Sequence, residues 1–292
     1  MKFYIVDAFS EELFGGNPAG VVLVGPRQDF PADEIMRKTA AELRYSETAF
    51  VKKLGEQTFE TRYFTPEAEV DLCGHATIAT FHALTEAKII PAKGQFLNKT
   101  KAGDLSIITN DGQIYMEMGQ PKAMGVIQDR NAMQELYQVL GVGNIVGQLG
   151  NKLLPELVST GLPDIIVPVP HEKILNSIRP DFSALAELSK KYQAVGVHAF
   201  TVGDDGLFHV RNFAPLYGID EEAATGTANG ALTYYLYRHG LVKPNAETVF
   251  IQGEAMSRPS KVTAILSEEN NQVQIFVGGK AVTLANGDIS LY

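Results

Sequence analysis

The sequence has 292 residues, of which 45% are hydrophobic and 20% are charged, and its formal net charge is −9. Such a chain can bury a core as one large domain or two of average size, and its acidity argues against nucleic acid or an anionic membrane as a partner. A single cysteine excludes an internal disulfide and a cysteine-rich metal site. Asp7 interrupts the first apolar segment, and no apolar run reaches the roughly 18 residues of a spanning helix, so we expect a cytoplasmic protein that crosses no membrane.

Alternation, apolar periodicity and turn residues predict strands and helices in a mixed order. The predicted strands span residues 2–9, 21–24, 48–51, 59–64, 103–109, 113–118, 199–202, 207–211, 248–251, 261–266, 272–277 and 281–284. The predicted helices span residues 31–43, 76–83, 131–140 and 181–192. Asn110-Asp111-Gly112 is a strong hairpin signal between two of the strands. The glycine-rich loop at residues 14–20 lacks the G-x-G-x-x-G spacing, so we expect no dinucleotide site.

A stretch of the first half of the chain occurs again in the second half. RYFTPEAEVDLCGHATIATFHA, residues 62–83, is matched by RNFAPLYGIDEEAATGTANGALTYYLY, residues 211–237. Cys73-Gly74 in the first copy is answered by Thr225-Gly226 in the second, and each pair leads into a helix of small residues. An internal repeat of this kind predicts two similar domains.

The seam between the two domains is expected near Gln120-Pro121, which gives residues 1–119 and 120–280. Two similar halves usually pack about a pseudo-twofold axis. Such packing brings the two glycine-started helices toward one cleft. The first N–H groups of a helix have no intrahelical partner, so the two helix starts together are expected to hold a small anionic metabolite.

Three carboxylate or imidazole positions of the chain are candidates for acid–base chemistry. Glu47 lies between Ser46 and an apolar strand, where desolvation would suit it to proton transfer, although a solvated carboxylate at a strand start is equally ordinary. His75 follows Gly74, where the positive helix end favours a neutral imidazole, although a packed structural histidine fits as well. Glu222 closes the Asp220-Glu221-Glu222 run, which ordinary helix-dipole pairing also explains.

Cys73 stands at a helix start, where a thiol becomes more acidic. A two-base racemase would need a partner of similar acidity at the repeated position, and Thr225 is far too weak an acid. Cys73 is therefore interpreted as a lining residue. His75 and His82 do not have zinc-ligand spacing, and no P-loop or G-x-S-x-G motif occurs, so we expect neither a metal nor a cofactor.

The segments FGGNPAGVV, RYSETAFV, RYFTPEAEVDLCGHATIA and FAPLYGIDEEAATGTANGAL together resemble the PhzF family of phenazine-biosynthesis-like isomerases, which shares its fold with diaminopimelate epimerase. The resemblance runs from residue 3 to about residue 280. It implies an α+β fold of two similar domains, each a curved, mostly antiparallel sheet wrapped around a central helix, with a C-terminal tail at about 281–292 that packs back on the first domain. It also implies cofactor-free acid–base isomerisation of a small carboxylate in the cleft between the domains, and it allows a homodimer.

By the same resemblance, Glu47 is the catalytic acid/base, with His75 and Glu222 as its catalytic partners. Glu222 stands where the phenazine enzyme has aspartate, Thr227 where it has serine, and Ala76 where it has proline. The longer side chain of Glu222 indicates a substrate other than the phenazine precursor. The residues expected to bind substrate are Asn17, Ser46, Cys73, Gly74, Thr225, Gly226 and Thr227. A non-catalytic metabolite-binding protein and an epimerase that uses Cys73 remain as alternatives.

Overall fold

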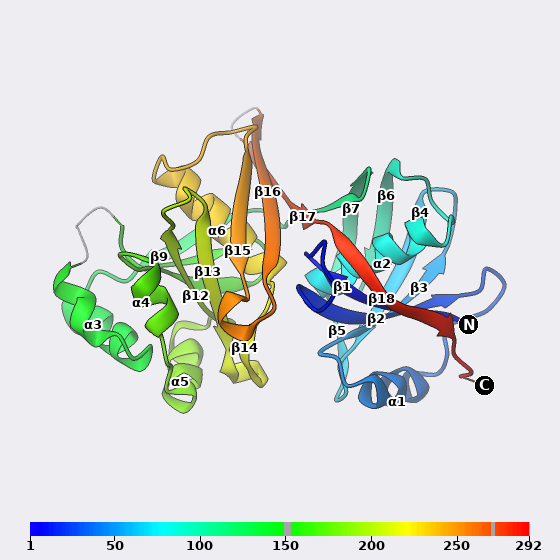
Figure 1. Cartoon of the computed structure of the whole chain (residues 1–292), viewed down its shortest axis with the longest axis horizontal. Helices are drawn as coiled ribbons and strands as arrows, with labels where there is room; N and C mark the ends of the chain where they lie inside the picture. Colours follow the sequence, from blue (N-terminus) through cyan, green and yellow to red (C-terminus); the bar gives the residue numbers. More distant parts are fainter. Residues whose placement is uncertain (149–152, 270–271, 292) are drawn as a thin grey trace. The chain divides into compact units, whose positions relative to one another are not determined.

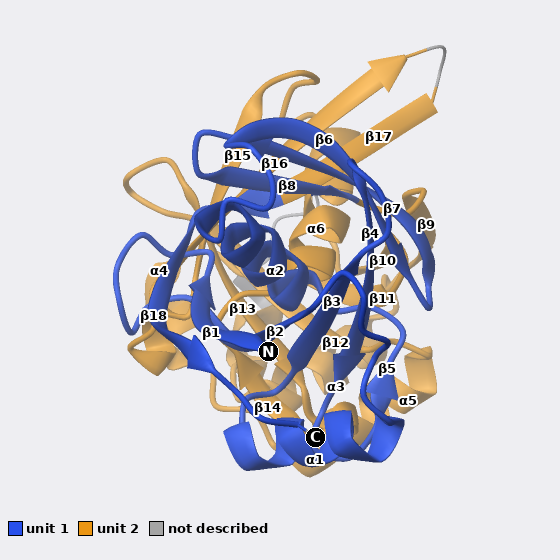
Figure 2. Ribbon diagram, turned by 90° about the vertical axis from the view of Figure 1, so that its right-hand side faces the viewer, with its two compact units in different colours: residues 1–117, 278–292 blue, residues 118–277 orange. Residues whose placement is uncertain are grey.

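Figure 1 shows the computed structural model, which describes residues 1–148, 153–269 and 272–291. The chain divides into two compact units, which are described separately (Figure 2). Unit 1 comprises Met1–Glu117 and Gly278–Tyr292, and unit 2 comprises Met118–Val277. The chain thus passes between the units near residues 117 and 278. The boundaries expected from the sequence lie after residues 119 and 280.

Unit 1 is a mostly antiparallel sheet with a helix on each face. Its strands are β1 (Lys2–Ala8), β2 (Asn17–Val24), β3 (Thr48–Lys53), β4 (Thr58–Phe64), β5 (Glu69–Val70), β6 (Lys93–Thr100), β7 (Gly103–Asn110), β8 (Gln113–Glu117) and β18 (Ala281–Asp288). Only the β2–β3 and β4–β6 pairs are parallel among the described pairs of this unit. The helices are α1 (Asp33–Leu43) and α2 (Gly74–Glu86). The C-terminal strand β18 pairs with β1, so the end of the chain completes this unit.

Unit 2 repeats this strand order. Its strands are β9 (Lys122–Val126), β10 (Glu156–Ser159), β11 (Pro163–Pro168), β12 (Gly196–Val202), β13 (Phe208–Ala214), β14 (Ile219–Glu222), β15 (Glu247–Gln252), β16 (Ser260–Glu269) and β17 (Gln272–Gly279), which runs across the boundary. Its helices are α3 (Arg130–Val139), α4 (Glu172–Ser177), α5 (Phe182–Tyr192) and α6 (Gly226–Arg238), with 3-10 turns η1 (Gly143–Gln148), η2 (Pro215–Tyr217) and η3 (Glu254–Met256). The parallel pairs β11–β12 and β13–β15 correspond to β2–β3 and β4–β6.

The central helices α2 and α6 are buried because their own residues are small or apolar on nearly every face. In α2 every residue from His75 to Phe81 is buried, and in α6 every residue from Ala228 to Thr233 is buried. A helix without a polar face belongs in the interior. Figure 2 shows α2 enclosed by the strands of its own unit, and α6 packs on β10, β11 and β16.

The opposite face of each sheet is covered by amphipathic helices. In unit 1, Met36 and Ala40 of α1 pack on Val22, Phe50 and Phe64. In unit 2 a larger core joins α3, α4 and α5 to the sheet. Its buried members from these elements are Leu136, Tyr137, Leu175, Leu185, Leu188, Ile165, Val167, Val197, Ala199 and Phe213. Each unit therefore has the layers helix, sheet, central helix.

An equivalent arginine–glutamate ion pair stabilises the connection that leads into each central helix. Arg62 of β4 donates to both carboxylate oxygens of Glu69 at 2.7 and 3.0 Å. Arg211 of β13 donates to both oxygens of Glu221 at 2.8 and 2.7 Å. A bidentate, charge-assisted pair is directional as well as strong. The repeated arginine of the sequence thus fixes the connection that leads into each helix.

The α+β class, the two similar units and the curved sheet around a central helix agree with the fold expected from the sequence. The pseudo-twofold relation between the units stays a prediction. One local difference concerns residues 17–20, which were expected in a loop. They belong to β2, because the pairing of Ala8 with Asn17 starts the β1–β2 ladder there. Among the described residues, no helix has both the length and the apolar character needed to span a membrane.

Candidate active site

The end of α1 directs the chain toward Glu47. Arg44 closes α1 in the left-handed conformation, with φ 59°, and the chain then turns through Ser46 and Glu47 into β3. The parallel register of Gly20 with Thr48 places this turn beside the start of β2, and Gly20 donates its backbone N–H to the Glu47 carbonyl at 3.4 Å. Glu47 is thereby fixed just before β3, an interior strand that pairs with β2 and β4.

The start of α2 brings Cys73 and His75 to the same place. Cys73 precedes the helix in an extended conformation, and no side chain caps the first turn. Its carbonyl accepts from the Thr77 hydroxyl at 2.7 Å, and Thr77 is in turn 2.7 Å from the hydroxyl of Tyr63. Asn98 donates to Tyr63 at 3.1 Å. This buried chain of hydrogen bonds fixes the helix start against the sheet.

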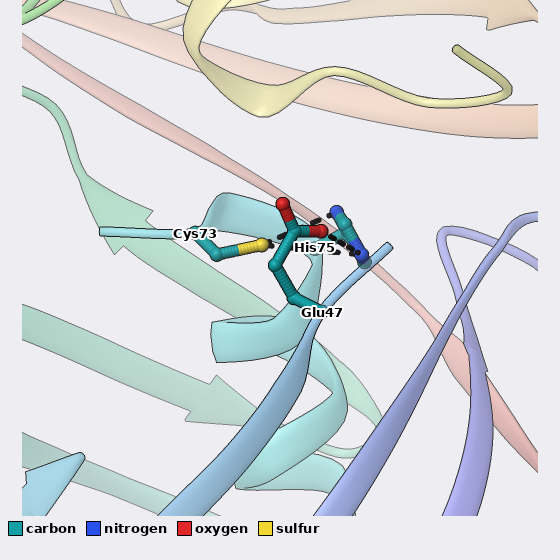
Figure 3. Close-up of side chains that lie close together, drawn as sticks. All are labelled: Glu47, Cys73 and His75. Carbon is teal, nitrogen blue, oxygen red and sulfur yellow. Dashed lines mark hydrogen bonds and ion pairs between the residues drawn. The ribbon is translucent and has the colours of Figure 1, made fainter. Parts of the chain in front are cut away.

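Three side chains converge at this point, as Figure 3 shows. Nε2 of His75 lies 3.3 Å from Oε2 of Glu47, and Sγ of Cys73 lies 3.4 Å from Nδ1 and 3.9 Å from Nε2 of the same ring. Asn17 and Ser46 flank the imidazole, with Nδ2 of Asn17 at 3.2 Å from Nδ1 and Oγ of Ser46 at 3.4 Å from Nε2. All five are predicted site residues, and Gly74 lies between two of them.

His75 is a neutral imidazole near pH 7. Burial lowers the pKa of His75, and the nearby Glu47 carboxylate opposes this only in part. With the Asn17 amide assigned so that Nδ2 donates to Nδ1, the ring proton lies on Nε2, the nitrogen that faces Ser46 and Glu47.

One carboxylate oxygen of Glu47 differs from the other polar atoms of the cluster. Its Oε2 is buried and has no hydrogen-bond partner within the described part of the chain, although the His75 ring lies beside it. A buried carboxylate oxygen without a partner is costly, so such an atom usually marks a place where a proton, a water or a ligand is bound. The arrangement can therefore exchange a proton at Glu47 next to a neutral imidazole.

The same atoms also form a set of metal-type donors. One donor atom each from Glu47, Cys73 and His75 lie within 4.8 Å of one another. This set is not apparent in the sequence, because metal-site motifs place their ligands at short spacing, and Glu47 comes from a different element from Cys73 and His75.

The start of α6 in unit 2 has a different environment. The Thr225 hydroxyl donates to Oε2 of Glu222 at 2.6 Å, and Gln252 donates to the same hydroxyl at 3.1 Å and to the Glu222 carbonyl at 2.8 Å. Gln252 also accepts from the Thr225 backbone at 3.1 Å and from Asn229 at 2.9 Å. Glu222 and Thr225 were predicted as site residues, and Gly226 and Thr227 follow in the first turn of α6.

Two further buried groups of unit 2 were missed by the sequence analysis. His198 lies 3.2 Å from both Asn229 and Asn212, and burial lowers the pKa of His198 to about 4. Asp164 of β11 is buried, and burial together with the Glu222 carboxylate raises the pKa of Asp164 to about 8. Asp164 could have been found from the sequence, because it is an acidic residue inside the apolar run PDIIVP.

The structure thus joins Asn17, Ser46, Glu47, Cys73 and His75 in unit 1. In unit 2 it joins Glu222 to Thr225. The two groups belong to different units, so their use of one common cleft stays a prediction, as do the catalytic and binding roles assigned to them.

The chain matches the phenazine biosynthesis-like protein family (PhzC-PhzF) over residues 6–287. An uncharacterized isomerase of Clostridium acetobutylicum is 33% identical over 99% of this chain and 98% of its own length. The crystal structure of a PhzF-family phenazine biosynthesis protein of Bacillus anthracis has a TM-score of 0.87 and 27% identity, with 99% of each chain covered. A probable proline racemase of Agrobacterium radiobacter shares the fold alone, with a TM-score of 0.67, 11% identity, and 100% and 93% of the two chains covered. The chain therefore belongs to the phenazine biosynthesis-like (PhzC-PhzF) family of isomerases.

Proposed function

We propose that this protein is a cofactor-independent isomerase that moves a proton between two carbons of a small carboxylate or amino-carboxylate. In this proposal the Glu47 carboxylate takes the proton from one carbon, and the resulting carboxylic acid returns it to another. Proton relocation next to an activating group needs only a positioned acid/base, so no metal or redox cofactor enters the reaction.

The observation that carries the proposal is the buried Oε2 of Glu47, which has no hydrogen-bond partner within the described residues. His75 supports it by presenting a neutral ring at 3.3 Å, which can donate to charge that develops on the substrate without competing as a cation. Asn17 and Ser46 orient the ring from either side. A well-placed acid/base of this kind contributes roughly 10²–10⁴-fold to the rate.

We further propose that the substrate carboxylate is bound by the first N–H groups of α2, and that the start of α6 takes part in holding the same substrate. The repeated backbone supports this, since each helix starts with a glycine and no side chain caps the first turn of either. Glu222, held by the Thr225 hydroxyl, would then contact an amino or hydroxyl group of the substrate.

One contact favours a second candidate, an epimerase in which Cys73 acts as a base together with Glu47. Sγ of Cys73 lies 3.4 Å from Nδ1 of His75, and a thiol beside an imidazole is an arrangement that activates sulfur. Thr225 stands at the equivalent place in unit 2 and offers no second thiol. We therefore rank this candidate below the carboxylate mechanism.

The experiment that tests the proposal starts with a thermal-shift screen of small carboxylates and amino-carboxylates. Each ligand that stabilises the protein is then incubated with the enzyme in D₂O, and deuterium at carbon is followed by NMR. The proposal predicts deuterium at a carbon-bound position of at least one such ligand, at a rate that depends on enzyme concentration. Stabilising ligands without any carbon-bound exchange would indicate a non-catalytic metabolite-binding protein instead.

A further inference from the structure

The three donors at the start of α2 have the chemistry of a transition-metal site. A thiol, an imidazole and a carboxylate are the ligand types that zinc sites combine. A tetrahedral Zn²⁺ with bonds of about 2.0–2.3 Å separates nitrogen and oxygen ligands by about 3.3 Å and sulfur and nitrogen ligands by about 3.6 Å. Nε2 of His75 lies 3.3 Å from Oε2 of Glu47 and 3.9 Å from Sγ of Cys73. These two pairs are close to the required spacing, and all three donor atoms lie within 4.8 Å of one another.

Two further observations point to a bound cation. Oε2 of Glu47 is buried and without a hydrogen-bond partner in the described parts of the chain, so a cation there would satisfy an atom that is otherwise costly. The His75 ring is also buried, with a side chain that is 2% exposed, and lies 3.3 Å from that oxygen, so a second donor already stands beside it for the same ion.

Asn17 completes the site as a partner of the histidine ligand. A metal on Nε2 requires the ring proton on Nδ1, and metal-binding histidines donate that proton to an oxygen. Asn17 lies 3.2 Å from Nδ1, and rotation of its amide presents Oδ1 in place of Nδ2. Asn17 can therefore support both the metal-free and the metal-bound ring.

We propose that Glu47, Cys73 and His75 bind one thiophilic divalent cation, with Zn²⁺ as the model ion, and that the metal-bound protein is inactive. Binding replaces the thiol proton of Cys73, which is released to solvent, and leaves a fourth position for water. The inhibition rests on the proposed function, because the metal occupies the carboxylate that would transfer the proton. The binding itself does not.

The test measures binding before activity. Chelator-treated protein is titrated with Zn²⁺ by calorimetry, and Co²⁺ is added separately as a spectroscopic probe. We expect one site per chain and a thiolate-to-cobalt charge-transfer band. Cys73→Ser and Glu47→Gln should each raise the Zn²⁺ Kd at least about 100-fold, and Asn17→Ala about 10–100-fold, the usual effect of losing a partner of a histidine ligand.

His82→Gln is the matched control. His82 lies on the same helix, next to Thr283 at 3.1 Å and Glu86 at 3.5 Å, outside the cluster. The control should bind Zn²⁺ as the wild type does. Metal-free thermal unfolding checks that each variant is folded, and alkylation of Cys73, the only cysteine of the chain, replaces the serine variant if that variant does not fold.

The proposal is overturned if Co²⁺ gives no thiolate band, if Cys73→Ser and Glu47→Gln bind Zn²⁺ like the wild type, or if His82→Gln loses as much affinity as they do. Activity is compared as the ratio of each protein's rate with and without Zn²⁺. Wild type should lose at least about tenfold at saturating Zn²⁺, while Cys73→Ser should keep a ratio near one. Binding with unchanged turnover would contradict the inhibition and the role of Glu47, but not the site.

Discussion

Unit 1 and unit 2 present nearly the same backbone at the starts of α2 and α6 but surround it with different side chains. The residues before the two helices, Cys73 and Thr225, are both extended, with φ −141° and ψ 117° against φ −129° and ψ 103°, and both helices have 13 residues. In unit 1 the first turn of the helix carries a neutral histidine, His75, which lies beside a carboxylate oxygen without a hydrogen-bond partner among the described residues. In unit 2 it faces the amide of Gln252, which joins Thr225, Glu222 and Asn229.

The strand registers show why a carboxylate equivalent to Glu47 does not occur in unit 2. Thr48 pairs with Phe64, and Val197 pairs with Phe213 at the matching place of the repeat. Gly196 therefore takes the position of Glu47. A Cβ at Gly196 would lie 2.1 Å from the Phe213 carbonyl oxygen, so no side chain fits there. One repeated backbone thus places a histidine beside a carboxylate in unit 1 and a hydrogen-bonded amide network in unit 2.

The largest effect is expected from Glu47→Gln. The amide keeps the size of the side chain but cannot take a proton, so turnover should fall about 10²–10⁴-fold with thermal stability retained. Turnover on a ligand found by the screen is the measurement. Glu56→Gln, the same change on an exposed turn of unit 1, is the control and should behave as wild type. Full activity of Glu47→Gln would remove the acid–base role from Glu47.

Gln252→Leu tests the support in unit 2. It removes the acceptor of the Thr225 N–H, and it leaves the Asn229 amide with the Thr225 carbonyl as its remaining acceptor. We expect the free energy of unfolding to fall by about 1–3 kcal/mol, measured by urea denaturation. A variant as stable as wild type would mean that this network does not stabilise the start of α6.

The dependence of stability on acid pH should include a contribution from His198. This residue has no equivalent in unit 1, where Ala49 stands at the matching position. The folded protein holds the pKa of His198 at about 4, below the ordinary value, so the unfolded chain binds the proton first as the pH falls. The contribution of His198 to stability is therefore lost as the pH falls from about 6.5 toward 4, by about 2 kcal/mol between pH 7 and pH 5, while Asp164, whose pKa is raised, acts in the opposite direction.

Urea denaturation of His198→Gln at pH 7 and pH 5 measures this contribution. Between pH 7 and pH 5 the free energy of unfolding of the variant should fall by about 2 kcal/mol less than that of wild type, whatever its stability at pH 7. The exposed His171→Gln should keep the wild-type profile. A profile of His198→Gln as steep as that of wild type would assign this dependence on acid pH to other groups.

Cys73→Ala should have the smallest effect. The change removes one sulfur from the cluster, and a one-proton shuttle already has Glu47. Turnover in metal-free buffer should stay within about tenfold of wild type, equivalent to about 1.4 kcal/mol of barrier. A bulky alkyl group on Cys73 should instead block the site by volume. If the alanine variant is as inactive as Glu47→Gln, Cys73 is a base and the epimerase becomes the better account.

The architecture could be predicted from the sequence because its determinants are local or repeated. The Arg62 and Arg211 stretches revealed the two units, and the hairpin at Asp111-Gly112 adopts the positive φ values that such turns require. Asn17 in a strand was missed, because a Gly-Asn-Pro run is typical of loops and only the pairing with Ala8 keeps it in the sheet.

The residues of the candidate site were predicted one by one, but their contacts with one another were not, and their roles stay predictions. Glu47 lies in a different motif from Cys73 and His75, and their approach depends on the β2–β3 register and on the position of α2, which no local pattern reports. Gln252, Asn229 and His198 were missed for the same reason. Each is a polar residue inside an apolar element, and its partner comes from a distant strand or helix.

The most direct test of the division between the two units is the steady-state comparison of Glu47→Gln with Glu222→Gln on the same substrate. If unit 1 transfers the proton and unit 2 holds the substrate, Glu47→Gln lowers kcat about 10²–10⁴-fold with little change in KM. Glu222→Gln should then act mainly by raising KM. A fall in kcat of equal size for Glu222→Gln, with KM unchanged, would contradict this account and place a second acid/base in unit 2.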